Sequence, residues 1–222
     1  MKQVPEVTDY CNRCLNTERW NGSVLLMVVD ASFTSIGLSY FHSVVPKVDL
    51  FRRQFLKTGE IKSLDDLPGA DDDMLRSLWK NRRSWLMAKA IAAYLTEIKK
   101  KNKLNDRETL RLWAKSAVLE NWDNNPVGAI TGVGINSYQY LRMMGGIDTV
   151  MPDKIVKRVI NGIIEEAGEK PPATDIDFVK TVESLGPETG YRAIELCWMT
   201  WLIQSEADVI HMQKHKEILS KI

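Results

Sequence analysis

Ile130-Thr131-Gly132-Val133-Gly134 is the first of two segments that decide how this sequence is interpreted. The second lies further along the chain and is Pro152-Asp153-Lys154-Ile155-Val156-Lys157-Arg158-Val159. Glycine takes positive φ readily and lets a backbone approach a ligand closely. The first segment therefore predicts a turn that enters a helix and offers backbone amides to a phosphate. The second predicts a helix opened by an acid, which would place one carboxylate near that phosphate. The alternatives are a glycine-rich link between two helices and an ordinary helix cap at Asp153.

Outward from these segments the chain is helical, because apolar residues recur at helical spacing and no run of β-alternation is present. A short break is expected at 30–34, with Ser35 capping the helix that follows. The fold class is therefore all-α. We expect helices over 20–29, 35–45, 48–56, 74–101 with a break near Asn81, 106–122, 138–144, 153–167, 175–185, 187–205 and 207–222.

The composition of the chain limits the classes of protein to which it can belong. The 222 residues are 44% apolar and include seven Trp, which is typical of a globular protein. The net charge is only +1, so a nucleic-acid surface would have to be a local basic patch. No apolar run approaches the length of a membrane span. Only three cysteines are present, which favours a reducing, cytoplasmic setting over a disulfide framework.

A basic strip follows Asp153. Lys154, Lys157 and Arg158 share one face of the expected helix. Cations at that place would hold a DNA backbone while the carboxylate faces a sugar. The alternative is an ordinary solvated helix face.

Residues 130 to 159 resemble the helix-hairpin-helix DNA glycosylase superfamily, in its endonuclease III-like group. The signature of that superfamily is a hairpin of the form Leu-Pro-Gly-Val-Gly, a short helix, and then Val-Asp-x-x-Val-x-Arg-Val. The resemblance extends more weakly over about residues 20 to 165. It implies a two-lobed helical fold, with a six-helix barrel lobe at 30–150 that carries the hairpin at about 126–144. Both chain ends, 1–29 and 151–222, would form the second lobe.

The resemblance also implies a base-excision repair enzyme that flips a damaged or mismatched base out of DNA and hydrolyses its N-glycosidic bond. Asp153 would be the catalytic carboxylate. Ser32 or Phe33 would fill the gap left in the duplex, and Tyr138 would contact the flipped base. The residues expected to bind DNA are Gly132, Val133, Gly134, Asn136, Ser137, Lys154, Lys157 and Arg158.

The sequence departs from the superfamily pattern at several positions. Asn136 stands where bifunctional members carry a lysine, and an amide cannot form a Schiff base with the sugar. Ile155 stands where a histidine is frequent, and the four-cysteine iron–sulfur loop is missing. The resemblance therefore implies a monofunctional enzyme, without lyase activity and without the cluster. The alternatives are a non-catalytic protein that binds DNA structure and a helical scaffold whose glycine turn is coincidental.

No cofactor is expected beyond a monovalent cation at the hairpin. Cys11 and Cys14, with His211 and His215, have the residue types of a zinc site, but a single CxxC is weak evidence, so zinc is not expected. The expected partner is double-stranded DNA with a lesion or mismatch, bound by a monomer associated with the nucleoid in the cytoplasm. No residue indicates which base is removed.

Overall fold

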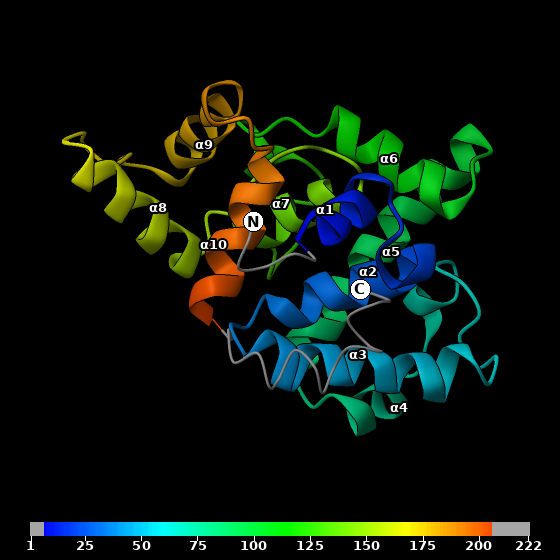
Figure 1. The fold of residues 1–222 in the computed structure, drawn as a ribbon. Helices are drawn as coiled ribbons and strands as arrows, with labels where there is room; N and C mark the ends of the chain where they lie inside the picture. The colour runs from blue at the N-terminus through cyan, green and yellow to red at the C-terminus, as the bar shows by residue number, and fades with distance from the viewer. Residues whose placement is uncertain (1–6, 206–222) are drawn as a thin grey trace.

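The computed structural model describes residues 7–205, which form ten α-helices and no strand (Figure 1). The predicted all-α class is therefore confirmed for this part of the chain. The helices are α1 (Val7–Leu15), α2 (Val24–Thr34), α3 (Val45–Phe51), α4 (Asp72–Leu78), α5 (Arg82–Asn102), α6 (Asp106–Ser116), α7 (Ile135–Met144), α8 (Lys154–Glu166), α9 (Asp175–Thr189) and α10 (Ala193–Ser205). Shorter helical turns lie at Arg19–Gly22, Tyr40–Val44, Arg52–Leu56, Leu67–Gly69 and Trp122–Asn124.

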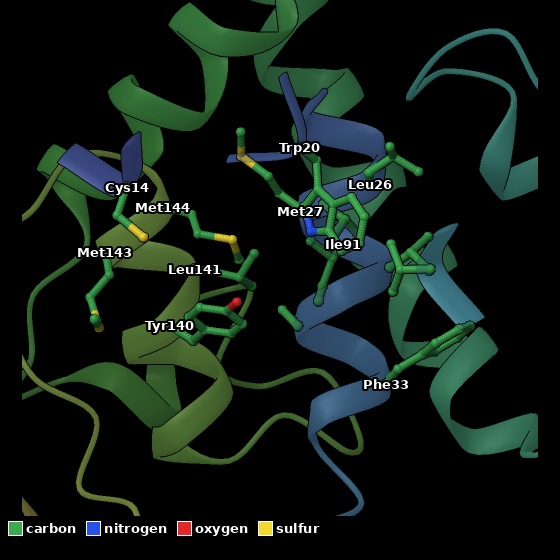
Figure 2. Packing of buried hydrophobic residues seen from close by; sticks show 14 of the residues in the cluster. Cys14, Trp20, Leu26, Met27, Phe33, Ile91, Tyr140, Leu141, Met143 and Met144 are labelled. Atoms are coloured by element: carbon green, nitrogen blue, oxygen red, sulfur yellow. The ribbon is translucent and has the colours of Figure 1, made fainter. Parts of the chain in front are cut away.

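Helix α2 is the central element of the core. Every residue from Val24 to Phe33 is buried, as expected for a helix that is apolar on nearly all sides. It packs against α5 and against α7. Figure 2 shows Tyr140, Leu141 and Met144 pointing from α7 towards α2. This contact fixes α7, and with it the glycine turn that precedes α7, relative to the core.

Side-chain caps begin several helices where the sequence predicts a start. The Asp71 carboxylate accepts a hydrogen bond from the Met74 amide at 2.8 Å and caps α4. The Asn81 side chain accepts from the Ser84 amide at 3.0 Å and caps α5, which confirms the predicted break near Asn81. Such caps satisfy amides that have no partner within the helix.

The predicted break at 30–34 is wrong, because α2 continues to Thr34 and the loop lies at 35–39. Asp30 and Ser32, two of the polar residues that suggested a break, are buried within the helix, where the carboxylate of Asp30 accepts hydrogen bonds from several donors. The next helical turn is capped by Ser39 rather than by Ser35.

Other predicted boundaries also need correction. The predicted 106–122 helix ends at Ser116, and α7 begins at Ile135 instead of 138. Helix α9 extends through Pro187 to Thr189, beyond its predicted end at 185. The helix predicted at 207–222 lies outside the described residues.

The first and last described helices lie together. Helix α10 packs against α1 and against α8 and α9, the pair at the left of Figure 1. Segments from both ends of the described chain therefore build one region of the molecule. Within residues 7–205, no helix combines the length and the apolar character needed to cross a bilayer.

Candidate active site

A cleft of about 660 Å³ lies where segments from distant parts of the sequence meet. Its walls come from the end of α2 and the loop after it, the glycine turn and first turn of α7, the start of α8, and the far end of α10. Arg83 at the start of α5 completes the lining. The structure therefore brings together the two segments that the sequence singled out.

The backbone conformation of the glycine turn requires a glycine at position 132. The Val133 amide donates to the Ile130 carbonyl at 2.9 Å, which closes the turn, and Gly132 has a φ of +104°. A Cβ at Gly132 would also lie 3.3 Å from Nε of Arg83. Gly134 differs, because its φ is −109° and a Cβ there would meet open space. Only Gly132 is therefore required by backbone conformation.

The first turn of α7 faces the cleft. Gly134 occupies the N-cap position and offers no side-chain cap, and the first helical hydrogen bond runs from the Tyr138 amide to the Gly134 carbonyl at 3.0 Å. The amides before Tyr138 consequently have no acceptor within the helix. Ile135, Asn136 and Ser137 all line the cleft. This arrangement favours an anion at the entrance of α7.

Asp153 lines the same cleft as the N-cap of α8. Its Oδ1 accepts a hydrogen bond from the Ile155 amide at 2.8 Å, which fixes the orientation of the carboxylate. Among the described residues it forms no ion pair, and the residue is only partly buried. The second carboxylate oxygen therefore remains available to a ligand.

The basic strip after Asp153 divides into two parts. Lys154 is exposed and lines the cleft beside Asp153. Lys157 instead donates to Asp175 of α9 at 2.6 Å, and neither Lys157 nor Arg158 is part of the cleft lining. Arg83, which the sequence did not indicate, is exposed on the cleft and forms no ion pair within residues 7–205.

Four aromatic residues form one wall of the cleft. The rings of Tyr40 and Trp201 have centroids 5.7 Å apart in an edge-to-face arrangement, and those of Trp198 and Trp201 are 5.9 Å apart in the same arrangement. Tyr140 meets Trp198 edge-to-face at 6.4 Å. Such contacts hold flat side chains in defined positions. The wall is therefore rigid, and Trp201 is the one ring of the four that is more than 5% exposed and can meet a ligand directly.

A buried ion pair lies behind this wall. Arg19 and Asp30 are both fully buried, with Nη2 and Oδ2 separated by 3.7 Å. Nη2 of Arg19 donates to the hydroxyls of Tyr40 and Tyr140 at 2.7 and 2.9 Å. Both hydroxyls donate in turn to Oδ2 of Asp30, at 3.0 and 2.9 Å, and Nε1 of Trp20 donates to the same oxygen at 2.8 Å.

This network determines what the two tyrosines can do. Burial raises the pKa of both tyrosine hydroxyls, so they stay protonated. Burial also raises the pKa of Asp30, whereas Arg19 and the hydrogen bonds from Trp20, Tyr140 and Tyr40 oppose that rise. Since each hydroxyl proton is donated to Asp30, neither tyrosine has a proton left for a ligand.

Ser32, Phe33 and Tyr138 do not lie at the cleft, contrary to the roles predicted for them. Ser32 and Phe33 are fully buried in α2, and Phe33 stacks on Trp79 with ring centroids 4.3 Å apart. Tyr138 is fully buried, meets Trp113 edge-to-face at 5.6 Å and donates its hydroxyl to the Val118 carbonyl at 3.3 Å. These positions belong to the core because α2 continues through them and because α7 turns Tyr138 towards α6.

The loop that follows α2 supplies a different residue. Leu38 lines the cleft and is 47% exposed, which is unusual for a large apolar side chain. It follows Gly37, whose φ of +70° forms the turn after α2. Sequence reasoning missed Leu38 because it placed the break five residues too early, at 30–34 instead of 35–39.

The four residues with the types of a zinc site, where zinc is not expected, are only partly described. Cys11 and Cys14 are fully buried free thiols in α1, whereas His211 and His215 lie outside the described residues. Burial raises the pKa of the Cys11 thiol, which disfavours the thiolate that a metal needs. No group of three or more metal-binding side chains is found in the range 7–205.

Comparison with known protein families, with curated proteins and with solved structures found no match to this chain.

Proposed function

We propose that the protein is a monofunctional DNA glycosylase that flips a damaged or mismatched base and hydrolyses its N-glycosidic bond with Asp153 as the catalytic carboxylate. The observation that carries the proposal is that one cleft contains both the first turn of α7, whose amides have no helical acceptor, and the carboxylate of Asp153. A phosphate and the adjoining sugar of one nucleotide would meet these two groups together.

The entrance of α7 would hold the phosphate. The amides of residues 135–137 have no helical acceptor, and the positive end of the α7 dipole adds to their attraction for an anion. The exposed cations Lys154 and Arg83 lie on the same cleft and supply further charge for the DNA backbone. These local cations account for DNA binding by a chain whose net charge is only +1.

Asp153 would act on the sugar. Breaking an N-glycosidic bond leaves positive charge on the deoxyribose in an oxocarbenium-like transition state. A fixed carboxylate beside that charge is worth about 3 kcal/mol in a site shielded from water. The same group can accept a proton from the attacking water. Because Asn136 lines the cleft where an amine would be needed, no Schiff-base lyase step is part of the proposal.

The base must leave the duplex before this chemistry, and a protein side chain must then fill the gap. We assign that role to Leu38, whose exposed apolar side chain lies on the cleft. The predicted helix-hairpin-helix motif and the two lobes, 30–150 and 1–29 with 151–222, belong to this proposal too. The contacts of α10 with α1, α8 and α9 support the second lobe.

The test compares the wild-type protein with Asp153→Asn on a panel of lesion-bearing duplexes, with released base measured by mass spectrometry. Asparagine keeps the size of the side chain and its ability to cap α8. We expect release of a base by the wild type and a loss of about 100- to 1000-fold in the variant, with duplex binding retained. If both proteins bind duplex equally and neither releases a base, the protein is the non-catalytic DNA-binding alternative.

A further inference from the structure

The connection between α7 and α8, residues 145–153, ends at Asp153 and brings its carboxylate to the cleft. This connection is neither helix nor strand, so no regular pattern of backbone hydrogen bonds fixes its course. Pro152 restricts only its own φ. The position of the carboxylate relative to the entrance of α7 therefore depends on the contacts that the connection makes with the neighbouring helices.

Gln139 of α7 supplies two of these contacts. Its side chain is fully buried, and its Nε2 donates to Oγ1 of Thr149 at 2.7 Å and to the Val150 carbonyl at 3.1 Å. Its Oε1 accepts from Nη1 of Arg142 at 2.6 Å. Because an arginine can only donate and a backbone carbonyl can only accept, these partners determine which way the amide points. The side chain of Gln139 therefore joins α7 to the connection in one orientation.

Thr149 extends this chain of hydrogen bonds to α9. Its side chain is fully buried, and its hydroxyl, which accepts from Gln139, donates to Oε1 of Glu183 at 2.6 Å. The preceding residue, Asp148, accepts from the Ile194 amide at 3.0 Å at the start of α10. Three consecutive residues of the connection are thus held by α7, α9 and α10, and only two residues separate them from the carboxylate on the cleft.

A buried amide at position 139 needs an explanation, because removing such a group from water costs free energy unless all its hydrogen bonds are made. An apolar side chain of the same length would fill the space without that cost. What the amide adds is a fixed position for the connection. Gln139 follows Asn136 by about one helical turn, and Asn136 lines the cleft. The position of Asp153 is therefore set by the same helix whose first turn would hold the phosphate.

Resting on the proposed function, we propose that Gln139 and Thr149 are positioning residues, which hold Asp153 at the distance from the entrance of α7 that a single nucleotide requires. Neither side chain lines the cleft. They act through the backbone of the connection, on the place of the carboxylate beside the sugar. A catalytic group displaced by about 1 Å can lose about 100-fold in rate, so small movements of the connection matter.

The experiment compares Gln139→Met, Thr149→Val and Thr149→Ser with the wild type. Methionine keeps the length of glutamine without its hydrogen bonds. Valine keeps the shape of threonine without the hydroxyl, whereas serine retains the hydroxyl. Thr109→Val is the matched control, because Thr109 is also fully buried and its hydroxyl donates to the Asn105 carbonyl at 2.7 Å, at the start of α6 and away from the cleft lining.

Three quantities are measured on each protein. The first two are the single-turnover rate of base release from the lesion-bearing duplexes and the affinity for the same duplexes. The third is the amide proton chemical shift of Ile155, read by NMR without DNA, because that amide donates to Asp153 at 2.8 Å and reports the place of the carboxylate. The Met74 amide is the internal reference, since Asp71 caps α4 in the same way at 2.8 Å.

We expect Gln139→Met to slow base release about 100-fold and Thr149→Val about tenfold, with the affinity for duplex unchanged, because the carboxylate moves and the phosphate site does not. The Ile155 amide proton should shift in both variants, and that of Met74 should not. Thr149→Ser and Thr109→Val should match the wild type in all three measurements. Rescue by serine identifies the hydroxyl as the group that matters.

Base release by Thr149→Val at the rate of Thr109→Val overturns the proposal, and this comparison decides the matter even if Gln139→Met fails to fold. A loss of duplex affinity as large as the loss of rate overturns it as well, because the network would then support the binding surface as a whole. Absence of base release by the wild type overturns the proposed function instead. In that case the Ile155 shift still decides whether Gln139 and Thr149 hold Asp153 in place.

Discussion

Gly134 is a residue whose role can be tested without disturbing the fold. It precedes α7 at the N-cap, its φ of −109° suits any residue, and a Cβ there would meet nothing within 4 Å. Gly132 is unlike it, because a φ of +104° would strain any other residue. A side chain added at Gly134 would therefore extend into the space where we place the DNA phosphate.

We predict that Gly134→Asp binds duplex DNA about tenfold more weakly than Gly134→Asn, because the two side chains have the same shape and only aspartate repels a phosphate. Both residues are good helix caps, so α7 should remain stable in each variant. Binding is measured by fluorescence anisotropy at two salt concentrations, with thermal unfolding as a check of the fold. Equal affinities for the two variants would show that no phosphate binds at the entrance of α7.

At the scale of one element, the loop at 35–39 turns the chain away from α2 and carries Leu38 on the cleft. Its two ends are fixed by hydrogen bonds. The Ser35 hydroxyl donates to the Ser32 carbonyl at 2.7 Å, and the Ser39 hydroxyl accepts from the His42 amide at 3.3 Å. The loop therefore holds an exposed leucine in a defined place, as a side chain that enters a duplex requires.

Leu38→Ala should slow base release from duplex DNA about tenfold and leave release from the same lesion in single-stranded DNA unchanged. The reason is that only a duplex has a gap to be filled after the base is flipped out. Single-turnover rates on matched duplex and single strand measure the effect.

The matched control for this prediction is Leu112→Ala, because Leu112 is 41% exposed on α6 and does not line the cleft. It should leave both rates unchanged. Should Leu38→Ala slow both substrates by the same factor, Leu38 acts on the base pocket and is not the side chain that fills the duplex.

At the scale of the whole molecule, the pair Arg19 and Asp30 connects segments that are distant in sequence. Arg19 begins a turn in which Trp20 and Asn21 have positive φ values of 53° and 56°, a backbone conformation that costs free energy in residues other than glycine. The network joins this turn to α2, to Tyr40, to α7 and, through the Trp198 ring, to α10. It therefore fixes the aromatic wall of the cleft from behind.

We predict that Asp30→Asn lowers the free energy of unfolding by about 3 kcal/mol, because it leaves the Arg19 guanidinium buried without a counter-charge. Arg19→Met should destabilise by a similar amount. The loss in free energy of unfolding in the double variant should be smaller, by at least about 1 kcal/mol, than the sum of the losses in the two single variants. The reason is that the second change removes a charge that the first left unpaired. Urea unfolding followed by tryptophan fluorescence gives the values. Additive effects would mean that the two charges do not depend on each other.

Local signals in the sequence predicted most helices and the residues that begin them. Three predicted helix starts have a capping side chain at or beside the predicted position in the structure. These side chains are Asp71, Asn81 and Asp153. These features depend on neighbours within one helical turn, so the sequence suffices to find them. The break at 30–34 was wrong because Asp30 is polar yet buried, and its partners lie up to 110 positions away in the chain.

The sequence alone therefore determined the all-α class, the glycine turn and the position of Asp153 at the start of a helix. Only the tertiary structure decided that these two segments share a cleft, that Leu38 and not Phe33 lies on it, and that Trp198 and Trp201 form its wall. The physical reason is the range of the interactions. Helix periodicity and capping act between residues that are close in the chain, whereas the walls of the cleft come from α2, α5, α7, α8 and α10 and meet only when the core is packed.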